Sequence, residues 1–146
     1  MIRVRYTSRT TLFFERLKVR VARGKREAIY SVSGLIARSA KQSLRIRAGA
    51  SRPGSIPHAH TRGGLRVIQF AVDRDKSIIG PIRFPRSQRY NEPAPHIQEF
   101  GKTVLDLRKG KVINFPKRPF MSRTLERLER KGLIPKQFSA SIARII

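Results

Sequence analysis

The chain has 146 residues and a formal net charge of +24 at pH 7, from 33 basic and 9 acidic residues. This length suits a single domain, and a charge of this size and sign predicts an acidic partner, either a nucleic acid or an acidic protein surface. The absence of cysteine excludes disulfides, thiolate metal sites and cysteine nucleophiles. No apolar run reaches the roughly 18 residues of a membrane span, so we expect no membrane partner and no signal peptide.

The positive charge is spread along the whole chain. Residues 1–50 carry 13 basic and 2 acidic side chains, residues 51–100 carry 8 and 4, and residues 101–146 carry 12 and 3. The charge is therefore not confined to a detachable tail. Because a compact chain with this charge repels itself, we expect a polyanion or an assembly with acidic neighbours to neutralise it.

The first part of the chain predicts a short strand and one long helix. Alternation over residues 1–7 is typical of a strand, and residues 12–44 are mostly helical in character. One helix face is expected to lie on the hairpin that follows, and it consists of Val21, Ala28, Val32, Leu35 and Ser39. The opposite surface is basic, which indicates either a solvated helix face or a row of phosphate contacts, the first being the more usual.

Residues 45–64 form a long segment without periodicity, rich in Arg, Gly, Ser and Pro. Loops of this length are usually functional or disordered. His58 and His60 raise the question of a metal site, but His96 is the only other histidine and there is no cysteine. Since a zinc site needs three or four convergent ligands, we expect no metal and no cofactor.

Residues 65–81 predict a β-hairpin. Ile68, Phe70 and Val72 share one face of its first strand, and the other face is also mostly apolar. The polar residues 73–76 form the turn, and the second strand ends at Pro81. A hairpin that is apolar on both faces needs two covers, for which we expect the long helix and another subunit.

A second hairpin follows a compact turn at residues 95–101. Glu99 in this turn lacks a partner for acid catalysis, so an ion pair with an arginine is the more probable role. Residues 103–107 and 112–115 flank a basic tip at residues 108–111, which either contacts DNA or an acidic partner or protects an edge strand from aggregation.

The C-terminal part predicts a helix and a further apolar helical segment. Pro119 suits the start of the helix and Gly132 its end. Beyond Pro135 an apolar stripe, which includes Phe138 and Ile142, predicts a helical segment docked on the core or on a neighbouring copy.

Several motifs occur in a fixed order along the chain. They are Ala40-Lys41-Gln42-Ser43, Pro57 to Thr61, Gly64-Leu65-Arg66, Ile78-Ile79-Gly80-Pro81, Glu99-Phe100-Gly101 and Arg118-Pro119-Phe120-Met121. With the order of elements, they resemble the tail-completion or tail-component family of long-tailed bacteriophages, whose members join head to tail at the neck. The resemblance covers residues 12–130. The chain differs from the family at Arg62-Gly63, an apparent insertion before the strand, and residues 133–146 form a C-terminal extension outside the resemblance.

The length and the predicted elements indicate a single domain over residues 1–146, with a long N-terminal helix packed on an antiparallel sheet of two hairpins and a shorter C-terminal helix. The resemblance likewise implies an α+β fold. It implies a structural virion protein, assembled in the host cytoplasm as a homo-oligomeric ring, with a hexamer as the expected form. Its partners would be the phage connector or stopper, the tail-tube proteins and the double-stranded DNA that passes through nonspecifically. It implies no catalysis.

Two sets of contact residues follow from these expectations. Subunit or partner contacts are expected at Pro57, His58, His60, Pro95, His96, Glu99, Phe100, Gly101, Arg118, Pro119, Phe120 and Met121. Contacts with DNA or an acidic partner are expected at Arg45, Arg47, Arg52, Arg62, Arg108, Lys109 and Lys111.

The charge alone also fits a basic nucleic-acid-binding protein of ribosomal or nucleoid type. Against this alternative, aromatic residues are not interleaved with the basic ones, and no RNP, KH or helix-turn-helix signature is present. A basic nuclease that uses His58, His60 and Asp73 is a more distant alternative.

Overall fold

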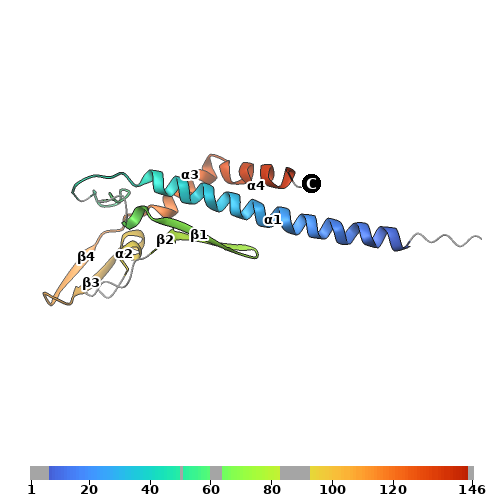
Figure 1. The fold of residues 1–146 in the computed structure, drawn as a ribbon. Coiled ribbons are helices and arrows are strands. Elements are labelled where there is room, and N and C mark those ends of the chain that lie inside the picture. The colour runs from blue at the N-terminus through green and yellow to red at the C-terminus, as the bar shows by residue number, and fades with distance from the viewer. Residues whose placement is uncertain (1–6, 50, 60–63, 83–92, 145–146) are drawn as a thin grey trace, which may run out of the picture.

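The computed structural model describes residues 7–49, 51–59, 64–82 and 93–144 and shows an α+β fold. The elements in chain order are α1 (Thr7–Ser43), a single 3₁₀ turn η1 (Gly64–Arg66), β1 (Ile68–Asp73), β2 (Lys76–Pro81), α2 (Ala94–Phe100), β3 (Lys102–Asp106), β4 (Lys111–Phe115), α3 (Met121–Arg130) and α4 (Leu133–Ala143) (Figure 1). The predicted fold class is confirmed. The strand predicted before residue 7 lies outside the described residues.

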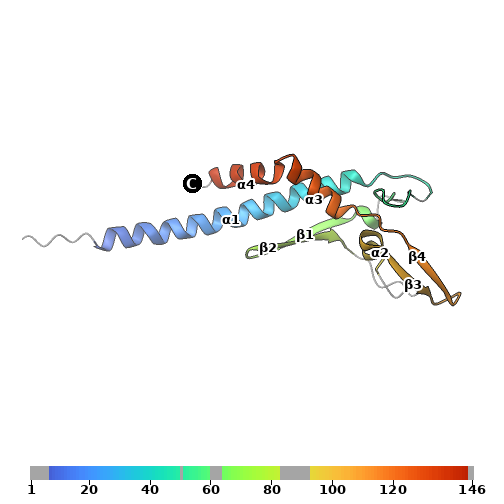
Figure 2. The ribbon, with the colours of Figure 1, turned by 180° about the vertical axis from the view of Figure 1, so that it is seen from behind.

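Helix α1 is the longest element, and β1, β2, α3 and α4 pack along it. The β1–β2 hairpin lies on one side of its C-terminal half, and α3 and α4 lie on another (Figures 1 and 2). The N-terminal part of α1 extends past the ends of both layers. None of the described helices is long and apolar enough to cross a membrane.

The two hairpins form two separate antiparallel sheets of two strands each, which corrects the expectation of a single sheet. In the first, Ile68 pairs with Pro81 and Asp73 with Lys76. The second hairpin, β3–β4, lies beside α2 at the far end of the molecule from the start of α1 (Figure 1). The hairpins do not form one sheet, because the first packs along α1 and the second lies away from it (Figure 1).

The predicted alternation in β1 is confirmed. Ile68, Phe70 and Val72 are half-buried towards the helix layer, and Gln69 and Ala71 are exposed. On β2 the outward residue Ile78 is 81% exposed. The outer face of the hairpin is therefore uncovered.

Small residues of α1 allow the hairpin to approach closely. The ring of Phe70 lies edge-on to Tyr30, with ring centroids 4.9 Å apart, and 3.8 Å from where a Cβ on Gly34 would lie. Ser33 donates to the carbonyl of Ile29, and its Oγ lies 2.6 Å from Oγ of Ser77 on β2. Gly34 and Ser33 thus form part of the α1 surface that contacts the hairpin. Neither residue contributes to the apolar periodicity of the sequence.

The prediction of which residues of α1 face the hairpin is therefore wrong in part. Val21 is 51% exposed, and Ser39 accepts a hydrogen bond from Arg127 of α3, 3.2 Å long. Only Ala28 of the predicted face is fully buried. Hydrophobic spacing identified the helix, but it could not show which layer covers each part of its surface.

The core lies where the C-terminal end of α1 meets the start of α3. Leu44, Ala59 and Phe120 are each at most 3% exposed, and Ile56, Leu65, Ile68 and Met121 pack around them. The loop after α1 is tied down by a parallel bridge, in which Ala59 N–H donates to Arg45 and Arg47 N–H donates to Ala59. These bonds hold the two ends of the loop, at Arg45–Arg47 and at Ala59, beside each other at the end of α1.

Helix α4 returns along α1. Gly132, two residues after the end of α3, has a φ of +63° and immediately precedes the first residue of α4. Gln137 of α4 donates to Ser31 of α1 over 2.6 Å. Of the two docking sites expected for the C-terminal segment, its own subunit and a neighbouring copy, the structure shows the first, because α4 packs on α1 and α3.

Candidate assembly and anion-binding surfaces

The Glu-Phe-Gly and Arg-Pro-Phe-Met motifs meet in one structural unit, which we call the α2–α3 joint (Gln98–Gly101 with Lys117–Ser122). The carboxylate of Glu99 accepts the backbone N–H groups of Phe120, Met121 and Ser122 at 2.9, 3.1 and 2.8 Å, and the Ser122 hydroxyl at 2.7 Å. The first N–H groups of a helix have no partner within it, and a negative charge there also suits the helix dipole. Glu99 therefore caps α3 from the end of α2.

This capping holds Glu99 in its charged form. Burial raises the pKa of Glu99. The hydrogen bonds from Ser122, Phe120 and Met121 together lower this pKa by more than burial raises it, so it lies below the usual 4.5. A carboxyl with a low pKa has no proton to donate at neutral pH. The expected ion pair with an arginine is absent among the described residues, where the carboxylate binds backbone N–H groups instead.

Two backbone contacts fix the other half of the joint. Arg118 N–H donates to the carbonyl of Gln98 over 2.7 Å. Gly101 has a φ of +68° and a ψ of 150°, a region that is almost restricted to glycine, and a Cβ there would lie 2.8 Å from the nitrogen of Lys117. The two motifs thus hold α2, the second hairpin and α3 together within one subunit.

The expected contact residues divide between the interior and the surface. Buried in the subunit are Pro57, Pro119 and Phe120; partly buried are His58, Pro95, Glu99, Gly101, Arg118 and Met121; exposed are His96 and Phe100. The rings of His96 and Phe100 lie 5.0 Å apart, and Phe100 is 64% exposed. His60 lies outside the described residues. On this face of the joint, the pair His96 and Phe100 is what a partner can reach.

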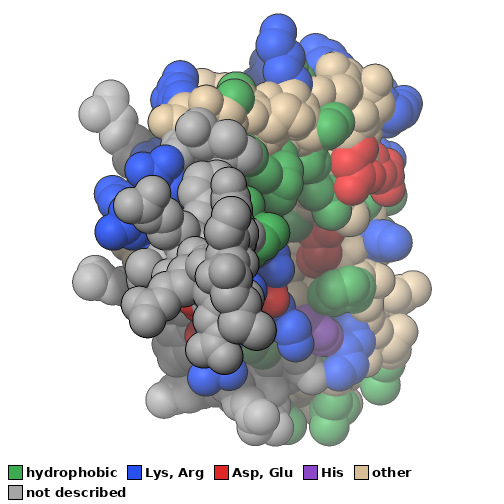
Figure 3. Space-filling view, turned by 90° about the vertical axis from the view of Figure 1, so that its right-hand side faces the viewer, with side chains coloured by type: hydrophobic (Ala, Val, Ile, Leu, Met, Phe, Trp, Pro, Cys, Tyr) green, Lys and Arg blue, Asp and Glu red, His purple; other side chains and the backbone are tan. Residues whose placement is uncertain are grey.

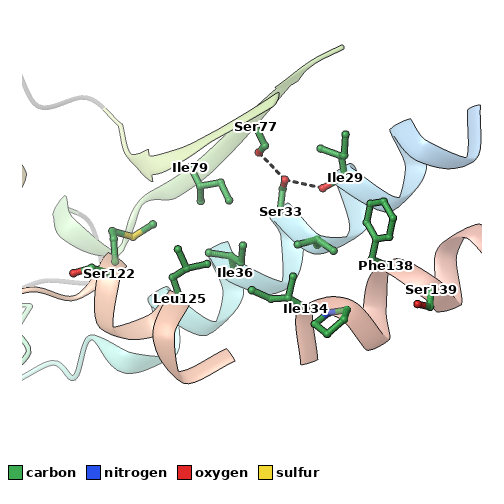
Figure 4. Close-up of a pocket in the computed structure, with 13 residues that line it drawn as sticks. Ile29, Ser33, Ile36, Ser77, Ile79, Ser122, Leu125, Ile134, Phe138 and Ser139 are labelled. Atoms are coloured by element: carbon green, nitrogen blue, oxygen red, sulfur yellow. Dashed lines mark hydrogen bonds between the residues drawn. The ribbon is translucent and has the colours of Figure 1, made fainter. Parts of the chain in front are cut away.

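An apolar groove of about 730 Å³ lies between β2, α1, α3 and α4. Ile79, Ile36 and Leu125 point toward one another from three of these elements, and Phe138 of α4 lies farther along (Figure 4). The remaining lining residues are Ile29, Val32, Ser33, Ser77, Met121, Ser122, Ile134, Pro135 and Ser139. None of the described residues that line this groove is charged.

The projecting part of α1 carries a second uncovered apolar surface. Phe14, Leu17 and Val21 are 55%, 38% and 51% exposed, and their spacing of three and four residues places them on one helix face. We call these three residues the apolar stripe. The same spacing continues to Gly24 and Ala28, which are buried in the body of the subunit. The stripe is thus the uncovered extension of a packed face.

The end of the molecule at which α1 projects has a mixed surface. Figure 3 views the molecule from this end and shows Lys and Arg side chains around the edges, with hydrophobic side chains exposed between them. The charged row on α1 is exposed, and it includes Arg16, Arg20, Arg23 and Arg26. Apolar and basic surfaces are thus presented together.

A basic pocket of about 450 Å³ lies at the opposite end of α1. Three segments line it, and its residues are Gln42, Ser43, Arg45, Ile56, Pro57, His58, Arg123 and Arg127. Arg45 and His58 were candidates from the sequence. No pattern in the sequence links Arg123 and Arg127 to them, because only the fold brings α3 against the loop.

The remaining basic candidates are exposed. Arg47 and Arg52 lie on the loop after α1, and Arg108, Lys109 and Lys111 lie at the tip of the second hairpin. Asp106, which is fully buried, accepts the N–H of Arg108 over 3.1 Å and so orders this tip. Arg62 lies outside the described residues. The structure brings Arg45 into a pocket but leaves the hairpin tip as a separate basic surface.

Within the described parts of the chain, no three His, Asp or Glu side chains lie close enough together to hold a metal ion. Comparison of the sequence with models of known protein families and with curated proteins, and of the structure with solved structures, finds no match. The sites described above therefore rest on geometry and chemistry alone.

Proposed function

We propose that this protein is a structural subunit of a bacteriophage neck, which assembles as a homo-oligomeric ring at the head-proximal end of the tail and joins the tail to the head connector. The observation that carries the proposal is a pair of surfaces on one chain, the apolar stripe and the apolar groove, both uncovered in the single subunit. Each is the kind of exposed apolar surface that marks a protein interface.

The two surfaces cannot cover each other within one subunit. The stripe and part of the groove belong to the same continuous helix, α1, whose projecting part leads away from the body (Figures 1 and 2). Between two copies, however, the stripe of one can enter the groove of the next. Such a contact uses different patches on its two sides, and it gives a ring when the rotation between copies closes.

The strength expected of this contact fits assembly on a template. Full burial of one apolar side chain contributes about 1.5–3 kcal/mol, while association costs roughly 4–15 kcal/mol. Three stripe residues therefore do little more than offset that cost, and the net charge of +24 opposes association further. Free subunits would associate weakly, and rings would form where a tail end and acidic neighbours hold several copies together.

The phage assignment rests on the motif resemblance, and it has a direct genetic test. Deleting the gene from the phage that carries it should leave full heads and tails that fail to join, or tails of abnormal length, in electron micrographs of lysates. A wild-type copy and a Val19→Gln copy should restore joined particles, because Val19 lies off the stripe. A Leu17→Gln copy should not restore them, because Leu17 lies on the stripe. Normal infectious particles without the protein would refute the proposal.

A basic nucleic-acid-binding protein is the second candidate, and the exposed basic row on α1 favours it. For this function the protein should bind DNA or RNA in the nanomolar range and lose that affinity steeply with salt. Weak binding without such an affinity, together with assembly into rings, would favour the neck function. Titration of labelled duplex at increasing salt concentration separates the two.

A further inference from the structure

We propose that the basic pocket binds a phosphate group of a nucleic-acid backbone. The inference is independent of how copies of the subunit assemble, because every lining residue belongs to one chain.

The pocket collects positive charge without any acidic side chain. Arg45, Arg123 and Arg127 all line it, together with His58, and none of the described residues that line it is Asp or Glu. Among the described residues, the ion pairs that involve arginine or lysine use Lys18, Arg23 and Lys25, and none uses these three arginines. Guanidinium groups held together repel each other, and an anion between them removes that cost.

The donors in the pocket are partly oriented and partly unused. Arg127 gives one N–H to Ser39 over 3.2 Å, which leaves other donors of its guanidinium group available. The Nδ1 atom of His58 is buried and has no hydrogen-bond partner. A buried polar atom without a partner is costly, and this nitrogen belongs to a residue that lines the pocket.

The backbone around the pocket is fixed before any ligand binds. Arg45 and His58 flank the bridge between Ile46 and Ala59, and Arg123 and Arg127 are one turn apart on α3, whose start is capped by Glu99. Such preorganisation lowers the entropy lost on binding. Arginine forks match the oxygens of a phosphate, and they are charged at any physiological pH.

The high net charge of the chain favours binding of a nucleic-acid backbone phosphate over binding of a free phosphate ion. The net charge of +24 attracts polyanions over long distances and concentrates them at this surface. A small phosphate anion gains much less from that field. The pocket then fixes one phosphate of a strand that the rest of the basic surface holds loosely.

The test compares two pairs of substitutions that remove equal charge from neighbouring positions. Arg123→Ala with Arg127→Ala removes two of the three arginine side chains that line the pocket. Arg130→Ala with Lys131→Ala removes the same charge from exposed residues that follow on the chain. Binding of a fluorescent DNA duplex to the full chain is followed by anisotropy at several salt concentrations. We expect the pocket pair to weaken binding by about tenfold or more and the control pair by about twofold. Equal losses in the two pairs would overturn the proposal.

A second variant and a second probe separate the remaining outcomes. His58→Ala removes hydrogen-bonding atoms and no arginine charge, and it should weaken DNA binding by about threefold. Thermal unfolding of each variant shows that it is folded, and it is repeated with inorganic phosphate. If phosphate raises the Tm of the wild-type chain but not of the pocket pair, while the two pairs lose DNA affinity equally, the occupant is a free phosphate and the backbone proposal is wrong. If neither probe distinguishes the pairs, the pocket is not a phosphate site.

Discussion

The two parts of helix α1 carry the same kind of apolar face but differ in what covers it. From Gly24 onwards the face lies against the hairpin and α4, and in residues 14–23 every side chain is exposed. A helix of this length needs tertiary packing for most of its stability, and the side chains of residues 14–23 remain exposed in the subunit. The difference indicates that one part holds the subunit together and the other part is available to a neighbour.

The largest effect expected from this difference is on stability. Leu44, directly after α1, is 1% exposed in the core, and Leu17 on the projecting part is 38% exposed. Leu44→Ala should lower the free energy of unfolding by about 2–5 kcal/mol, and Leu17→Ala by only about 0.5 kcal/mol. Urea unfolding of both variants measures this. Similar losses would mean that the projecting part also packs within the subunit.

The α2–α3 joint should tolerate change as poorly as the core does. Gly101→Ala adds a Cβ that meets the backbone of Lys117, in a conformation that other residues rarely adopt, and it should cost about 3 kcal/mol or more. Gly110→Ala is the control, because its φ of +61° is also positive but nothing lies within 4 Å of the added atom. Its cost should be about 1–2 kcal/mol. Equal costs would show that the close approach to Lys117 is relieved by a small shift.

The cap at Glu99 predicts a pH dependence of a definite sign. Its pKa in the folded chain is below 4.5, so as the pH falls the unfolded chain takes up the proton first. The stability from this cap is therefore fully present above about pH 5 and is lost as the pH falls through the folded pKa. Glu99→Gln should lower stability by about 1–2 kcal/mol at pH 7 and by less at pH 3. Thermal unfolding from pH 3 to 7 checks this, and a constant difference would contradict the capping role.

The smallest predicted effect is on self-association. Leu17→Gln, on the stripe, should weaken the association of purified subunits by about tenfold, and Val19→Gln, off the stripe, by less than twofold. Sedimentation velocity over a range of protein and salt concentrations measures both. Association should also rise with salt, because screening reduces the repulsion between basic subunits. Equal behaviour of the two variants would remove the stripe from the interface.

Local patterns predicted most elements of the fold. The alternation at Ile68, Phe70 and Val72 and the glycine at position 132 located the first hairpin and the end of the α3 segment. Helix α2 was expected as a turn, because Pro95 and a length of seven residues hide a helical pattern. What local patterns could not show was which segments meet.

The contacts that define the sites are all of this second kind. Glu99 caps a helix that begins 22 positions later, at Met121, and Arg45 shares a pocket with Arg123 and Arg127 from α3. No spacing of residues along the chain predicts these contacts between distant segments. The apolar stripe was visible only in part, since the predicted face included Val21 but placed it against the hairpin.

Cross-linking shows whether the apolar stripe of one copy lies in the apolar groove of another. The chain has no cysteine, so single cysteines can be placed at Leu17 on the stripe and at Ser139 or Leu125 along the groove. Two chains that each carry one of these are mixed and oxidised, and a disulfide forms only where the Cα atoms come within about 7 Å. We expect a covalent dimer of Leu17→Cys with one of the groove cysteines, and little with Val19→Cys, which lies on another face of the helix. Equal cross-linking of Leu17→Cys and Val19→Cys, or none with either groove position, would contradict it.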